Sequence, residues 1–174
     1  MAHRRFFRML CLLCAAACIL SVCSCKGAAP TPSGLLVAMQ EAEKPLPPGR
    51  VYLRSAAAED GTYLSDELLT ALFGNGAFPP AMDGVCDAAC FFSYTHPCEL
   101  AVFLCKSLSA TKAVSQMCLR RLDTLRQYRS YEGLSDAQVN AYLDAATVTV
   151  RGCYVILCVS SDPDAALRAL RRAT

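Results

Sequence analysis

Hydrophobic and polar residues follow two different periods along residues 50–174, and each period predicts a different kind of element. Two pairs of short segments, rich in branched and aromatic residues, predict two antiparallel hairpins. Around them, apolar residues recur at helical spacing and predict helices. The hairpin strands are expected at residues 89–94 with 99–105, and at 147–151 with 153–160.

Each expected helix begins at a residue that commonly caps a helix N-terminus, because its side-chain oxygen can accept a free backbone N–H. Ser135 with Gln138 also matches the capping-box pattern, and Gly74 is a typical helix stop. The longest helix is expected to run to about Tyr128. The capping residues are Ser65, Ser109, Ser135 and Asp162.

Hairpins interleaved with helices, without repeated parallel crossovers, predict an α+β fold. We expect a two-layer sandwich in which a mainly antiparallel sheet of about four strands packs against helices, with a further short strand near residues 50–55. About 125 residues suffice for one domain with one core. The predicted organisation is a signal segment over 1–24, a Pro/Gly-rich linker over 25–49 and a single domain over 50–174.

The first 25 residues resemble a bacterial lipoprotein signal. Arginines at positions 4, 5 and 8 precede a mostly apolar run over residues 9–22, which is shorter than the roughly 20 residues that a spanning helix needs. Val22-Cys23-Ser24-Cys25 then resembles the lipobox, which implies a diacylglyceryl group on Cys25 and residence at the outer face of the cytoplasmic membrane. An uncleaved signal anchor and a plain secreted protein are the alternatives.

Charge and cysteine content change the picture once this segment is set aside. Its removal leaves 14 Lys and Arg against 15 Asp and Glu, so no excess of positive charge suggests nucleic acid as a partner. Seven cysteines remain, an odd number, and several stand where a small apolar residue would serve. We therefore favour reduced core cysteines over a disulfide scaffold.

The chain also resembles a family of small Gram-positive lipoproteins that is defined only by a domain of unknown function. The matching stretches are 63–69, 72–74, 99–103, 114–122 and 152–163. Their order and spacing carry the resemblance, which implies a lipobox followed by one α/β domain. It implies no activity and no catalytic residues.

Arg121 is the first candidate for a site, because it projects from the apolar stripe of the long helix. An inward arginine requires a partner, and Glu99 at the start of a core strand is the one we expect. The pair is either structural or part of a ligand site. His96, in the turn before Glu99, completes the candidate ligand-binding set of Arg121, Glu99 and His96.

Two alternatives use the cysteines near His96. Cys86, Cys90, His96 and Cys98 offer four zinc ligands, but without the close Cys-x-x-Cys pairing usual in structural sites, so no metal is expected. A pair of His96 with Cys98 or Cys90 would suit nucleophilic catalysis. The chain has no phosphate loop and no Gly-x-Ser-x-Gly elbow, and no cofactor is expected.

A basic face that contacts anionic lipid or wall polymer is a further expectation. It would combine two helices, through Arg120, Arg126, Arg129, Arg168, Arg171 and Arg172. The sequence as a whole favours a non-enzymatic binding or interaction module whose partner is a protein, a wall component or a small ligand. The alternative is a small extracytoplasmic enzyme that uses a Cys/His pair.

Overall fold

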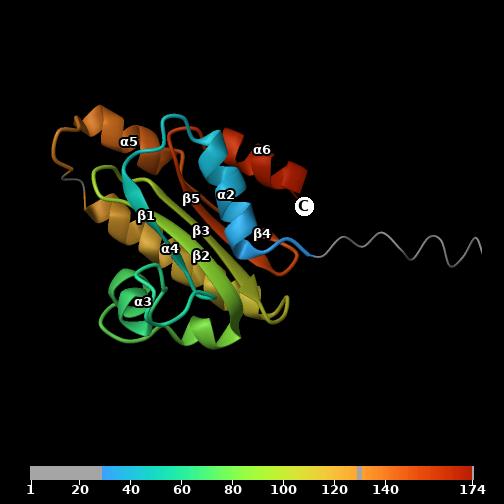
Figure 1. The fold of residues 1–174 in the computed structure, drawn as a ribbon. Coiled ribbons are helices and arrows are strands. Elements are labelled where there is room, and N and C mark those ends of the chain that lie inside the picture. Colours follow the sequence, from blue (N-terminus) through green and yellow to red (C-terminus); the bar gives the residue numbers. More distant parts are fainter. Residues whose placement is uncertain (1–28, 129–130, 174) are drawn as a thin grey trace, which may run out of the picture.

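The computed structural model describes residues 29–128 and 131–173. Its centre is a five-stranded sheet in the order β1-β2-β3-β5-β4, in which every neighbouring pair is antiparallel (Figure 1). The predicted signal segment and Cys25 lie outside the described residues. The strands are β1 (Gly49–Leu53), β2 (Val85–Ser93), β3 (Glu99–Cys105), β4 (Thr147–Arg151) and β5 (Tyr154–Val159).

Helices cover both faces of this sheet (Figure 1). Helices α2 and α6 lie side by side on one face, whereas α4 crosses the other face with α3 beside it. Within the described residues no helix has the length and apolar character to cross a bilayer. The helices are α2 (Pro32–Ala42), α3 (Asp66–Phe73), the short 3-10 helix η1 (Pro80–Gly84), α4 (Ala110–Gln127), α5 (Asp136–Asp144) and α6 (Pro163–Ala173).

The alternation of side chains along β3 divides the core into two clusters. Ala101 and Phe103 pack in the cluster on the α4 side, whereas Leu100 and Val102 pack in the cluster on the α2 side. Because both faces of the central strand are covered, its side chains are buried almost without interruption. This explains why residues 99–105 form a continuous apolar run rather than an alternating pattern.

The α+β class, the antiparallel sheet and both predicted hairpins are confirmed. The sheet has five strands rather than about four because β1 pairs with the outer edge of β2. A second helical layer, formed by α2 and α6, lies on the face that a two-layer sandwich would leave open.

The predicted linker over residues 25–49 is wrong for the part that the structure describes. Residues 32–42 form α2, whose Leu35 and Met39 are fully buried against the sheet. Thr31 caps this helix by accepting a hydrogen bond from the Gly34 N–H at 3.1 Å, and Pro32 occupies its first turn. Proline at this position favours a helix start because its missing N–H would have no partner there.

Three of the four predicted caps are confirmed. Ser65 accepts from the Leu68 N–H, Ser135 forms the capping box with Gln138, and the Asp162 carboxylate accepts from the Ala165 N–H at 2.9 Å. Ser109 is the exception, because its side chain makes no capping bond. The Ser107 hydroxyl accepts from the Ala110 N–H at 3.3 Å instead.

Candidate functional site

The predicted pairing of Arg121 with Glu99 is confirmed. The Arg121 Nε donates to Glu99 Oε2 at 3.0 Å, and its Nη2 donates to Oε1, so that two parallel bonds join the side chains. The pair is largely enclosed, with 14% of the arginine side chain and 8% of the glutamate side chain exposed. Such a forked arrangement holds both groups in one orientation.

Burial dominates the electrostatics of this pair. Removal from water raises the pKa of Glu99, and the hydrogen bond and charge of Arg121 act in the opposite direction. The arginine therefore offsets a desolvation cost that the carboxylate would otherwise bear alone. The pair ties α4 to the start of β3 at one end of the sheet.

A hollow of about 710 Å³ opens at the same end of the sheet, where two loops meet. Tyr94 and Thr95 come from the turn between β2 and β3, and Tyr128, Tyr131 and Glu132 come from the segment between α4 and α5. The rings of Tyr128 and Tyr131 have centroids 5.8 Å apart and stand almost perpendicular, at 83°. The hollow thus has aromatic walls and one carboxylate.

Tyr131 connects the hollow with the ion pair. Burial raises the pKa of the Tyr131 hydroxyl, and the nearby charge of Glu99 raises it further. Tyr131 also packs against the apolar cluster on the α4 side. It therefore stands between the buried carboxylate and the open hollow.

His96 does not line the hollow, but it contacts Thr95, which does. Its Nδ1 lies 2.8 Å from the Thr95 hydroxyl, and its ring meets that of Tyr142 edge to face at 6.0 Å. The structure therefore gathers the three predicted ligand-binding residues at one end of the sheet. None of the three lines the hollow itself.

Sequence reasoning missed the tyrosines of the hollow. Tyr94 and Tyr128 are 63% and 62% exposed, which is unusual for large rings in a chain with a well-filled core. They lie far apart in the sequence, one in a turn and one at a helix end, and only the fold brings them together. The one available signal was the presence of aromatic residues at positions where polar loop residues are usual.

A second buried carboxylate, Glu43, was also missed because the residues around it were assigned to a linker. It follows α2 and accepts from the Ser161 N–H at 3.1 Å, from the Ser161 hydroxyl at 2.7 Å and from the Ser160 hydroxyl. Glu43 is fully buried. These neutral donors fix the end of α2 to the end of β5.

The cysteines near His96 do not form a common site. Cys90 packs on the α4 side of the sheet and Cys98 on the α2 side, so the four-residue zinc set is divided between two faces. Burial raises the pKa of both thiols well above the usual range, which keeps them protonated at neutral pH. Among the described residues, no group of three or more His, Cys, Asp and Glu side chains is arranged to hold a metal ion.

The predicted basic face that combines two helices is wrong. Arg120 and Arg126 lie on α4, whereas Arg168, Arg171 and Arg172 lie on α6, across the sheet (Figure 1). Arg129 lies outside the described residues. The arginines of the two helices cannot contact one flat surface together.

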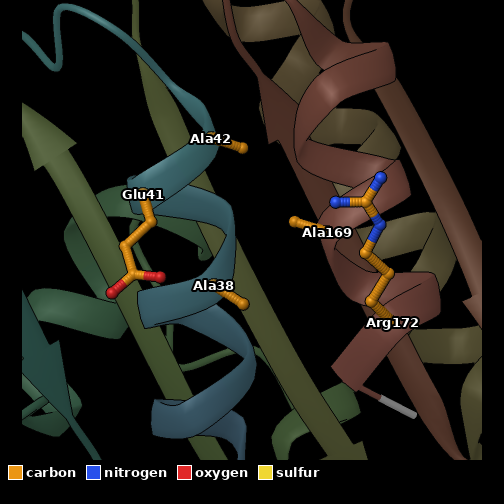
Figure 2. Close-up of a pocket in the computed structure, with 5 residues that line it drawn as sticks. All are labelled: Ala38, Glu41, Ala42, Ala169 and Arg172. Carbon is orange, nitrogen blue, oxygen red and sulfur yellow. The ribbon is translucent and has the colours of Figure 1, made fainter.

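A shallower hollow of about 370 Å³ lies between α2 and α6 (Figure 2). The methyl groups of Ala38, Ala42 and Ala169 face one another across it, and the Glu41 carboxylate points away from α6. Arg172 borders the hollow from the α6 side. The short alanine side chains on both helices leave this space between α2 and α6 unfilled.

Comparisons with known proteins add no relative. No family model matches this chain, and neither the curated proteins nor the solved structures include a significant match. The resemblance to the lipoprotein family therefore stays a prediction from the sequence.

Proposed function

We propose that this protein is held at the outer face of the cytoplasmic membrane by a diacylglyceryl group on Cys25, and that its domain is a non-enzymatic binding module. The apolar run over residues 9–22 and the cysteine after Ser24 support the anchor. Two acyl chains hold a protein at a membrane far more firmly than one. The domain is then free to meet ligands from the outside.

The tyrosine-lined hollow is the observation that carries the binding role. Its volume of about 710 Å³ lies in the usual range for small-molecule sites. The buried ion pair behind Tyr131 gives the walls a fixed support, and preorganised walls lose little entropy when a ligand binds.

The chemistry of the lining favours a ligand that carries an organic cation. The π faces of tyrosines attract ammonium groups, and the exposed carboxylate of Glu132 adds an opposite charge at the rim. Glu99 and Arg121 neutralise each other, so they add no net charge behind the aromatic wall. A wall component or a protein segment with an amino group would present such a cation.

Nuclear magnetic resonance titration of the lipidated protein in non-ionic detergent tests this role. Tetramethylammonium is the probe, and tert-butanol, of nearly the same shape but uncharged, is the control. We expect shifts in the tyrosine ring signals with the cation only. Tyr131→Ala should weaken binding about fivefold, since a cation over one ring contributes about 1 kcal/mol, whereas Tyr131→Phe, which keeps the ring, should bind nearly as well as the wild type.

Equal shifts with both probes, or an unchanged affinity in Tyr131→Ala with its fold intact, would remove the case for a cation site. The enzymatic alternative lacks a comparable observation, because burial raises the pKa of both thiols near His96.

A further inference from the structure

We propose that the outer surface of α6 and the turn between β4 and β5 lie directly against an anionic bilayer. We call this the arginine surface, and it consists of Arg151, Arg168, Arg171 and Arg172. The proposal rests on the proposed lipid anchor at Cys25 and adds the orientation in which that anchor holds the domain.

The length of chain between the anchor and the domain is the first argument. Only four residues lie between Cys25 and Pro30. The five steps from one to the other span at most about 3.6 Å each, so the acylated cysteine lies within about 18 Å of Pro30. The Pro30 carbonyl accepts a hydrogen bond from the Tyr154 hydroxyl at 2.6 Å, and Thr31 caps α2 directly afterwards. The chain is therefore attached to the domain almost at the anchor, with no spacer between them.

The point where the chain joins the domain, at the hydrogen bond between Pro30 and Tyr154, lies beside part of the arginine surface. Tyr154 begins β5 and pairs with Arg151 across the hairpin, so Arg151 lies next to the point where the chain leaves the domain. Helix α6 follows β5 and runs back beside α2, so its C-terminal end lies near the same point (Figure 1). The half-buried Arg151 and the exposed arginines near the end of α6 therefore lie on the side of the domain from which the chain leads back toward Cys25.

The arginine side chains of α6 point away from the sheet, and their positive charge complements an anionic bilayer. Ala166 and Leu170 are fully buried against the sheet. At about 100° per residue, Arg168, Arg171 and Arg172 point to the opposite side of the helix. All three are exposed, and none makes an ion pair within the part of the chain that the structure describes. Among the acids of this layer, Asp162 and Asp164 lie at the start of α6, whereas Glu41 borders the same hollow as Arg172, with its carboxylate pointing away from α6.

Anionic lipid headgroups suit such a surface. A juxtamembrane arginine strengthens binding to an anionic leaflet by about fivefold, and the effect falls off within about a Debye length, 8–10 Å. Only arginines on the anchored side of the domain come within that range. Arg120 on α4 lies behind the sheet and does not.

Tryptophan fluorescence can measure this orientation, because the chain contains no tryptophan. Val37 on α2 is 51% exposed and Leu119 on α4 is 40% exposed, so each accepts a single reporter on an opposite face. The lipidated Val37→Trp and Leu119→Trp proteins would be reconstituted into phosphatidylglycerol vesicles that contain spin-labelled lipid. We expect strong quenching of the α2 reporter and weak quenching of the α4 reporter, with the difference lost in phosphatidylcholine or at high salt.

Two matched double variants test the arginines themselves in the Val37→Trp background. Arg168→Gln with Arg171→Gln should lower the ratio of docked to undocked domain about 25-fold, at fivefold for each charge. Lys112→Gln with Arg120→Gln removes the same charge from α4 and should leave the quenching unchanged. Equal quenching of the two reporters, or equal effects of the two double variants, would overturn the docking.

The anchor can be judged separately in the same samples. Wild-type protein that stays on phosphatidylcholine vesicles through a high-salt wash has its anchor, whatever the quenching shows. If the wash removes the wild type, then the anchor fails and the docking proposal fails with it.

Discussion

The two ends of the sheet differ in chemistry. At the β2–β3 turn, two buried carboxylates, Glu43 and Glu99, are held by different partners, and tyrosines line a hollow beside them. At the β4–β5 turn, the half-buried Arg151 lies near the point where the chain enters the domain, and the exposed Arg171 and Arg172 lie at the end of α6. The two carboxylates at the first end are fixed by hydrogen bonds, whereas Arg168, Arg171 and Arg172 make no ion pair among the described residues. The difference suggests one end for recognition and the other for attachment.

The largest expected effect concerns attachment. Cys25→Ala removes the thiol that would carry the diacylglyceryl group, so we expect the protein to leave the membrane fraction and its processing to change. Fractionation followed by intact mass measurement checks both. A variant that is processed as before and still sediments with lipid would contradict the anchor, and the assignment of the two ends would lose its basis.

The ion pair at the recognition end gives the next effect. Arg121→Met leaves Glu99 buried and unpaired, so we expect a loss of about 3–5 kcal/mol in the free energy of unfolding at neutral pH. Glu99→Met with Arg121→Met removes both charges and should cost less than the single change. Urea denaturation of the wild type and both variants makes the comparison.

The pH dependence of Arg121→Met follows from the pKa of Glu99. Burial already raises that pKa, and loss of the arginine removes the interactions that lower it. With the folded value above the unfolded one, the penalty is full at high pH and shrinks as pH falls through the folded pKa toward 4.5, the ordinary value. The variant should therefore regain stability relative to the wild type on acidification, and a constant difference from pH 7 to about pH 4.5 would contradict this explanation.

Two glutamates at the C-terminal end of α2, the buried Glu43 and the exposed Glu41, allow a matched comparison of their contributions to stability. Glu43→Gln keeps the shape but places an amide among the donors of Ser160 and Ser161, so we expect a loss of about 1–3 kcal/mol. Glu41→Gln, two residues earlier and exposed, should change stability by less than about 0.5 kcal/mol. Chemical denaturation midpoints measure both, and equal effects would mean that the bonds to the serines contribute little.

The smallest expected effects are the losses of stability when a serine at a helix N-terminus is replaced, one at each end of the sheet. Ser135→Ala removes the capping box of α5 near the hollow and should cost about 1 kcal/mol. Ser109→Ala, at the start of α4, should cost only a few tenths, because that side chain makes no capping bond. Thermal unfolding curves detect the difference, and a larger loss in Ser109→Ala would show that its hydroxyl caps the helix in solution.

Local patterns predicted most elements because each element's residues are adjacent in the chain. Both hairpins, three of the four caps and the inward direction of Arg121 follow from spacing alone. Glu99 was predicted as its partner because Arg121 lies on the apolar face of the long helix and Glu99 is an acid at the start of a core strand. Helix α2 was missed because its flanking prolines suggested an extended segment, whereas burial of Leu35 and Met39 decides its structure.

The sequence by itself predicted the α+β class and the need of Arg121 for a charged partner, and both are confirmed. The location expected from the first 25 residues stays a prediction. Spacing and composition carry that information. Only the tertiary structure decided that two distant loops enclose a tyrosine-lined hollow, that the basic residues of α4 and α6 are on opposite faces and that α6 packs beside α2. These features depend on contacts between residues far apart in the chain, which no local pattern records.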